Sequence, residues 1–263
     1  MQNKEDENLD PFKFPKRALT IASAAFTLIF ILFFASLIVS VFQIQWRIEP
    51  TRTSFESGFL TITLPVNITN AGYYDINNFT IYTATSDNSS LLFSSSNTIP
   101  TIKSQSGTVF EHNVSINLTN FFAAHRNYLF NSATFQAVEN ISLTVGGLVP
   151  VSLAINHTIS WGAPLTNLNI ATPTVTPFNY THVQVSSNIR FSNAAVFPVE
   201  GTIVLTAYDN TQPLASTSYP INISSGASCD VTLLFFLPIS PQPTRFIMEM
   251  QTPYFTLEVP VNG

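Results

Sequence analysis

Charged residues are scarce in this chain of 263 residues, at 10% of the sequence, where soluble proteins usually have about a quarter. Beyond Phe42 the chain contains one lysine, Lys103, and the formal net charge of the whole chain is −5. Proteins that bind nucleic acid need clustered Lys and Arg side chains to contact phosphates. The composition therefore excludes a nucleic-acid partner.

Residues that carry chemistry are also scarce. The single cysteine, Cys229, excludes a disulfide scaffold and any site of several thiolates. The four histidines, at 112, 125, 157 and 182, lack the close pairing of zinc ligands. The chain has no glycine-rich phosphate loop, no G-x-S-x-G turn and no H-E-x-x-H motif. We therefore expect no catalytic residues, no metal site, no cofactor and a non-enzymatic role.

Apolar residues are abundant, at 45% with 23 phenylalanines, which excludes a disordered solvating chain. The run Ala18–Phe42 is apolar and has no charged residue. At about 1.5 Å per residue, a helix of this length exceeds the roughly 30 Å hydrocarbon thickness of a bilayer. A cleavable signal peptide is the alternative, but its apolar run is about 7–15 residues and ends in small residues. Here Val41, Phe42 and Trp46 mark the end, so residues 18–42 are expected to be an uncleaved signal anchor.

The flanks of the run predict its orientation. Lys13, Lys16 and Arg17 precede it, and Arg47 and Arg52 follow it. Basic residues are enriched on the cytoplasmic side of a span. We therefore expect a single-pass protein of the cell membrane, anchored in lipid by this helix. Its N-terminal tail would be cytoplasmic, and its body would be extracytoplasmic.

Asn-X-Ser/Thr sequons support this orientation, because they occur only after the apolar run. Where a cell glycosylates secreted proteins, such asparagines are acceptors on exposed surfaces. The candidate glycosylation sites are Asn67, Asn78, Asn88, Asn113, Asn117, Asn140, Asn156, Asn179 and Asn222.

The body has the period of β-strands. In the run from Phe59 to Thr69, apolar residues alternate with Thr or Asn, and similar runs recur at intervals of about ten residues. Short strands at this spacing are typical of a β-sandwich. The segment from Thr119 to Phe130 differs, because its apolar residues have helical spacing. We expect a short helix there, capped by Thr119 or Asn120 and covering an end of the first sandwich.

The two halves of the body repeat each other. The segment around Asn70 aligns with that around Asn193, with one single-residue gap, and both continue through the same order of strand signals. We therefore expect two domains of one kind. The expected order is a tail at 1–17, the membrane helix at 18–42, a first sandwich at 46–162, a proline-rich linker at 163–180 and a second sandwich at 181–263.

This repeat resembles the water-stress and hypersensitive-response domain of group 2 late-embryogenesis-abundant proteins. The shared features are an apolar strand ending in an Asn turn, a later proline (Pro100, Pro220) and a glycine (Gly107, Gly226) before a long alternating strand. The Asn-Pro usual in that family is replaced here by Asn-Ala. The resemblance implies tandem immunoglobulin- or fibronectin-III-like sandwiches of seven strands behind a membrane anchor, with no catalytic residues.

Three functions remain open from the sequence. The first is an extracytoplasmic structural or interaction module with a protein or glycan partner. The second is a stress-protective or lipid-contacting protein of the late-embryogenesis type, with a body that faces either side of the membrane. The third is a carbohydrate-binding surface module or an unrecognised hydrolase, which would need Tyr73, Tyr74 or Tyr254 to form an exposed aromatic platform.

Overall fold

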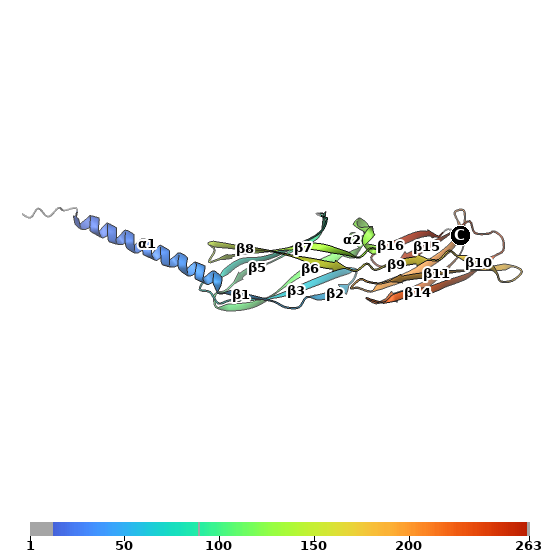
Figure 1. The fold of residues 1–263 in the computed structure, drawn as a ribbon, viewed down its shortest axis with the longest axis horizontal. Coiled ribbons are helices and arrows are strands. Elements are labelled where there is room, and N and C mark those ends of the chain that lie inside the picture. The colour runs from blue at the N-terminus through green and yellow to red at the C-terminus, as the bar shows by residue number, and fades with distance from the viewer. Residues whose placement is uncertain (1–12, 89, 262–263) are drawn as a thin grey trace, which may run out of the picture.

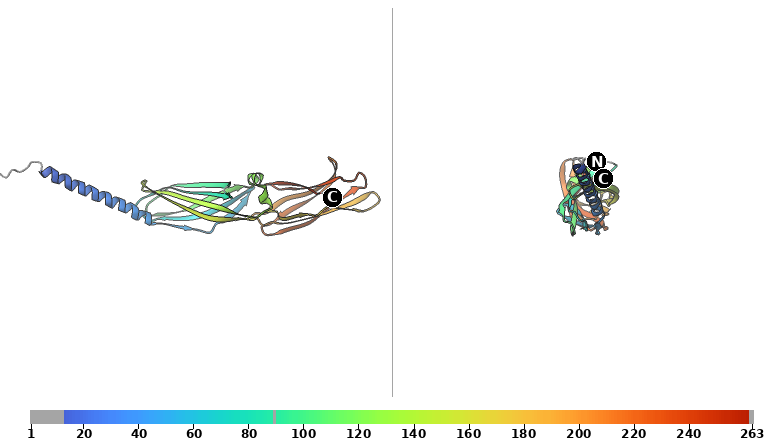
Figure 2. Two further views of the ribbon diagram at one scale, coloured as in Figure 1. Left: turned by 45° about the horizontal axis from the view of Figure 1, so that its top comes forward. Right: turned by 90° about the vertical axis from the view of Figure 1, so that its left-hand side faces the viewer.

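The protein is an elongated rod in which one helix and two β-sandwiches follow one another (Figure 1). The computed structural model describes residues 13–88 and 90–261. The left view of Figure 2 shows the same end-to-end order, and the right view looks along the rod. The expected fold class, an apolar helix followed by tandem sandwiches, is confirmed.

Helix α1 spans Lys13–Phe42 and contains the apolar run Ala18–Phe42, whose mean hydropathy of 2.7 and length are sufficient to cross a membrane. Most of its large side chains are exposed, so it is not a core helix. Only its last turns are covered, because Leu37 and Ser40 are buried against the first sandwich.

The first sandwich consists of two antiparallel sheets. In one, β3 lies between β6 and an edge formed by β1 and β2, which pair with successive parts of β3. Counting that interrupted edge once, the sandwich has three strand positions facing four. The strands of this sheet are β1 (Ile44–Ile48), β2 (Arg52–Glu56), β3 (Phe59–Asn70) and β6 (Ser106–Asn117). The facing sheet has the order β5-β4-β7-β8, from β4 (Ile76–Asp87), β5 (Ser90–Ile102), β7 (Ala133–Val145) and β8 (Val149–Trp161).

The second sandwich repeats this topology strand for strand. Its first sheet contains β9 (Thr166–Ile170), β10 (Thr174–Pro177), β11 (His182–Ser192) and β14 (Ser228–Pro238). Its second sheet contains β12 (Val199–Asp209), β13 (Gln212–Ile223), β15 (Arg245–Gln251) and β16 (Thr256–Val261).

The segment 163–180 is not the linker that its prolines predicted. Its strands β9 and β10 both pair with β11, so they form the interrupted edge of the second sandwich. Proline is compatible with an edge strand, because the edge leaves N–H groups without a ladder partner. The first sandwich likewise begins before residue 46, since β1 starts at Ile44.

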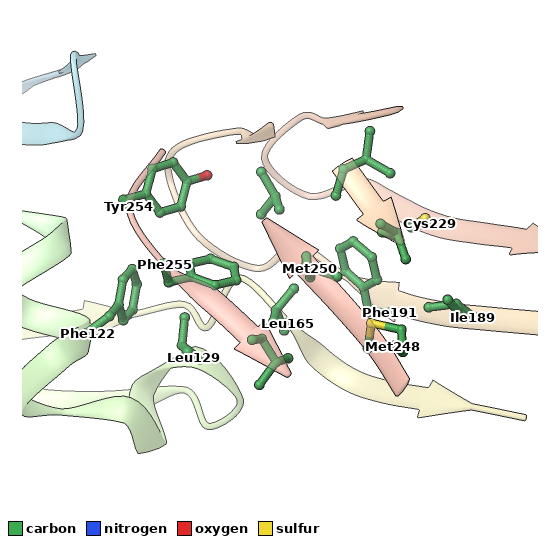
Figure 3. Close-up of a cluster of buried hydrophobic side chains, with 14 of the residues drawn as sticks. Phe122, Leu129, Leu165, Ile189, Phe191, Cys229, Met248, Met250, Tyr254 and Phe255 are labelled. Atoms are coloured by element: carbon green, nitrogen blue, oxygen red, sulfur yellow. The ribbon is translucent and has the colours of Figure 1, made fainter. Parts of the chain in front are cut away.

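One apolar cluster joins the second sandwich to the adjacent end of the first, and a separate cluster fills the helix-proximal part of the first sandwich. Between the two sandwiches lies helix α2 (Leu118–Ala124), followed by the 3₁₀ turn η1 (Arg126–Leu129). The predicted helix is therefore present, but its cap is Asn117, whose side chain accepts a hydrogen bond from the Asn120 N–H at 3.0 Å. Phe122 of α2 packs on Phe255 of the second sandwich, with ring centroids 5.7 Å apart (Figure 3).

Candidate ligand groove in the first sandwich

The predicted glycosylation sites are spread over the body rather than gathered into one site. Eight of the nine sequon asparagines are exposed, and Asn117 is half-buried as the cap of α2. Their exposure is compatible with glycans but does not mark a binding surface.

The prediction of an exposed aromatic platform for carbohydrate is wrong, because Tyr73, Tyr74 and Tyr254 do not share a surface. Tyr254 is buried between the two sandwiches, and its hydroxyl donates to the Pro198 carbonyl. Tyr74 packs on Phe33 of α1, with ring centroids 6.0 Å apart. Only Tyr73 is well exposed.

An apolar groove lies between the two sheets of the first sandwich. Two neighbouring cavities, each about 330 Å³, share the lining residues Leu64 and Glu139. One lies toward the helix, between Trp46 of β1 and Ile155 of β8. The other extends to Trp161, where the second sandwich begins. Each volume falls in the range of small-molecule sites.

The groove exists because strand β8 is poorly covered. Its inward-facing side chains at 149, 151, 155 and 159 are only half-buried, and Leu153 is 42% exposed. The facing sheet ends there at the short, interrupted strands β1 and β2. From Ile155 to Trp161 the wall runs six residues, about 20 Å at 3.3 Å per residue.

Polar side chains lie inside this otherwise apolar space. Thr83 of β4 is paired in register with Glu139 of β7. His112 faces them from the opposite sheet, and its Nε2 lies 2.8 Å from the Thr83 hydroxyl. Nε2 of His157 lies 3.7 Å from a Glu139 carboxylate oxygen. A polar cluster therefore crosses the middle of the sandwich.

Two buried polar atoms of the cluster lack a partner within the described chain: Nδ1 of His112 and the Thr85 hydroxyl. The His112 side chain is fully buried, and this burial lowers the pKa of its imidazole below the ordinary value of 6.5. The ring is thus neutral near pH 7. An unpaired buried polar group costs about 1–3 kcal/mol, which a ligand with hydrogen-bonding groups would offset.

The second sandwich is an internal control for this site. The strand registers match Thr83 with Leu205, Thr85 with Ala207 and Glu139 with Met248, because each occupies the same place in its pair of strands. They match His112 with Leu233 and His157 with Val261 in the same way. All five counterparts are apolar and buried, so the fold itself does not require the polar cluster.

This cluster was not predicted from the sequence, although a signal for it is present there. In β7, Glu139 has the inward phase of Ala137 and Ile141, and in β6, His112 has the inward phase of Phe110 and Val114. A charged or polar residue in the buried phase of a strand is the signal that marks both. Among residues 13–88 and 90–261, no three His, Cys, Asp or Glu side chains are grouped as metal ligands.

No family model and no curated protein sequence matches the chain. Among solved structures, it is similar to the transglutaminase of red sea bream, with 14% identity and a TM-score of 0.30 over 84% of this chain and 31% of that chain. A putative β-galactosidase from Bacteroides fragilis is similar at 11% identity and a TM-score of 0.30, over 80% of this chain and 33% of that one. The match thus covers about a third of either structure. Similarity at this level assigns neither a family nor an activity.

Proposed function

We propose that this chain is a single-pass membrane protein with an extracytoplasmic body, and that its first sandwich binds an elongated apolar molecule. The role is one of binding, without catalysis. It combines the interaction module and the lipid-contacting protein that the sequence left open. The observation that carries the proposal is the groove of the first sandwich, whose polar cluster occupies positions that are apolar and buried in the second sandwich.

The chemistry of the groove defines the ligand class. Its walls are apolar along about 20 Å, which is the length scale of a long acyl chain. The polar groups that line it include the neutral His112, the Thr83 and Thr85 hydroxyls, and the Glu139 carboxylate with the neighbouring His157. A carboxylate repels a fatty-acid anion, so the groove favours an acyl chain with a neutral hydroxyl or amide head.

Three features support anchoring with the body outside. The helix is apolar and exposed along most of its length. The basic residues cluster before it, and all sequons follow it. Eight of the nine sequon asparagines are accessible to a transferase.

Photo-crosslinking tests the binding role. Full-length protein in liposomes is exposed to a monoacylglycerol that carries a diazirine in its acyl chain, and the labelled peptides are mapped. We expect labels on α1, which contacts lipid, and also on the groove-lining part of β8. A Leu64→Trp variant should lose the β8 labels and keep the α1 labels, because Leu64 lines both cavities.

The matched control is Val109→Trp, which adds the same side chain at an outward-facing position of β6 that is 64% exposed. This variant should be labelled like the unchanged protein. Labels confined to α1, or β8 labels that survive in Leu64→Trp, would contradict binding in the groove.

A further inference from the structure

Each sandwich docks on the element before it through the same two loops. In the second sandwich these are loops 193–198 and 252–255, and they place Phe197, Tyr254 and Phe255 against the first sandwich. In the first sandwich the corresponding loops are 70–75 and 146–148. They dock on the last turns of α1.

The contact with α1 is specific. The Ser36 hydroxyl lies 2.7 Å from the Tyr74 hydroxyl, and Tyr74 corresponds to Phe197 in the repeat, four residues after the turn asparagine. A Cβ on Gly72 would lie 2.1 Å from the Ser40 hydroxyl, so glycine allows the loop to approach the helix. Leu37 is fully buried at this contact.

These loops leave large side chains uncovered in the first sandwich. Tyr73 is 65% exposed, Leu148 is 60% exposed and Phe42 is 83% exposed. We call these three residues the proximal rim. In the second sandwich the loop that corresponds to that of Leu148 buries Tyr254 and Phe255. The loop of Leu148 is thus less covered than its counterpart, whereas Val196, which corresponds to Tyr73, is also exposed, at 57%.

The helix itself shows what lies beside the rim. From Ala18 to Leu37 there are twenty residues, which span about 30 Å at 1.5 Å per residue, the thickness of the hydrocarbon layer. The turns after Leu37, and the loops docked on them, then lie at the level of the lipid head groups. Tyrosine is enriched at that level in membrane proteins.

The charged residues beside the rim are compatible with a position in the lipid head-group layer. Asp75 is the last residue of the loop that contains Tyr73, and its carboxylate is paired with Lys103, with Nζ and Oδ2 2.9 Å apart. The pairing with Lys103 lowers the pKa of Asp75, so the loop carries no unpaired charge into the interface. Because the last turns of α1 are packed on the sandwich, the rim cannot move away from the bilayer independently.

We propose that the proximal rim inserts into the head-group layer of the bilayer that α1 spans, so that the body stands on the membrane in one fixed orientation. This inference rests on the proposed membrane anchoring. The occupant of the rim is the lipid interface rather than a second copy of the chain, because α1 itself enters the bilayer at this point. The helix-proximal end of the groove, at Trp46, would then open beside the lipid head groups.

Depth-dependent quenching tests the proposal in the full-length chain in liposomes. On a Cys229→Ser background, which removes the single cysteine, a small fluorophore is attached at Tyr73→Cys or Leu148→Cys. Tyr180→Cys, fully exposed in the second sandwich, and Ile29→Cys, exposed in the middle of α1, are the matched controls. Nitroxide lipids labelled near the head group or deep in the acyl chain are the quenchers.

At positions 73 and 148 we expect loss of most of the fluorescence with the shallow nitroxide, and at 180 no loss. The label at position 29 should be quenched by the deep nitroxide. If position 29 is quenched and positions 73 and 148 are not, the rim proposal is wrong while the anchoring stands. If position 29 is not quenched, the anchoring fails and the rim proposal with it. A label at 148 that is shielded from water but not quenched by lipid would show a protein cover instead.

Discussion

Asn70 and Asn193 make the same turn in the two sandwiches, with the same partners. The Asn70 amide donates to the carbonyl oxygens of Tyr74 and Lys103, at 2.9 and 3.1 Å. The Asn193 amide donates to those of Phe197 and Ile223, each at 2.9 Å. Both side chains are buried, and each turn positions a docking loop.

Replacing either asparagine by alanine should destabilise the protein strongly. Asn70→Ala and Asn193→Ala each leave buried carbonyl groups without a donor, at a cost of about 1–3 kcal/mol per group. We expect each to lower the free energy of unfolding by about 2–3 kcal/mol in urea titrations. The control Asn169→Ala changes an exposed residue of β9 and should have little effect. Equal effects of all three variants would contradict the role of the turns.

The junction between the sandwiches requires Gly162. A Cβ there would lie 1.7 Å from the Ala194 carbonyl oxygen, which is backbone and cannot rotate away. Gly162→Ala should therefore destabilise the junction by about 1–3 kcal/mol and broaden the distance distribution between spin labels on the two sandwiches. Gly107→Ala is the control, because its Cβ would meet only ordinary contacts of 3.4 Å or more. A distribution in Gly162→Ala as narrow as in the unchanged protein would contradict the requirement for glycine at this position.

The fold was largely predictable, because it follows from residue types that repeat with period two. Alternation predicted long strands such as β3 and β7, and the repeat around Asn70 and Asn193 predicted two copies. The prediction of a linker at 163–180 was wrong, because prolines are compatible with an edge strand of a sheet as well as with an extended connector. Edge pairing depends on contacts distant in sequence, which local pattern does not contain.

The site was less predictable for a similar reason. Glu139 and His157 come from neighbouring strands, but His112 comes from the facing sheet. Their meeting depends on how the two sheets stack. Only their inward phase is local, and phase alone does not show that the space between the sheets is open.

The polar cluster should lower stability in exchange for binding. A variant with three residues of the second copy, Thr83→Leu, His112→Leu and Glu139→Met, removes the unpaired Nδ1 and fills part of the groove. We expect it to be more stable than the unchanged protein by about 1–3 kcal/mol in urea titrations, and to lose diazirine labelling of β8. A less stable variant that still binds would contradict a role for the cluster in binding.

His112 should make stability depend on pH. Its folded-state pKa lies below the ordinary value of 6.5, so between these values the unfolded chain binds more protons than the folded one. The contribution of the neutral His112 side chain to the free energy of unfolding is therefore fully present above pH 6.5, the ordinary pKa. It is lost as the pH falls from there through the folded-state pKa. Between about pH 7.5 and about pH 5.5, the melting temperature of His112→Gln should fall less than that of the unchanged protein. The control His182→Gln should behave like the unchanged protein.

Glycosylation should follow exposure. In a cell that glycosylates secreted proteins, we expect glycans on exposed asparagines such as Asn67 and Asn156 and none on Asn117, whose side chain caps α2. Peptide mapping with and without an amide-cleaving glycosidase measures the occupancy at each site. Complete absence of glycans from the body would argue for a cytoplasmic orientation.

The most direct test of the central claim is native mass spectrometry of the full-length chain, purified from its own membrane. The account predicts one apolar molecule retained per chain, also retained by Val109→Trp and lost from Leu64→Trp, which blocks the groove at the residue common to both cavities. A chain that carries no such molecule, or one that Leu64→Trp retains equally, would contradict the account.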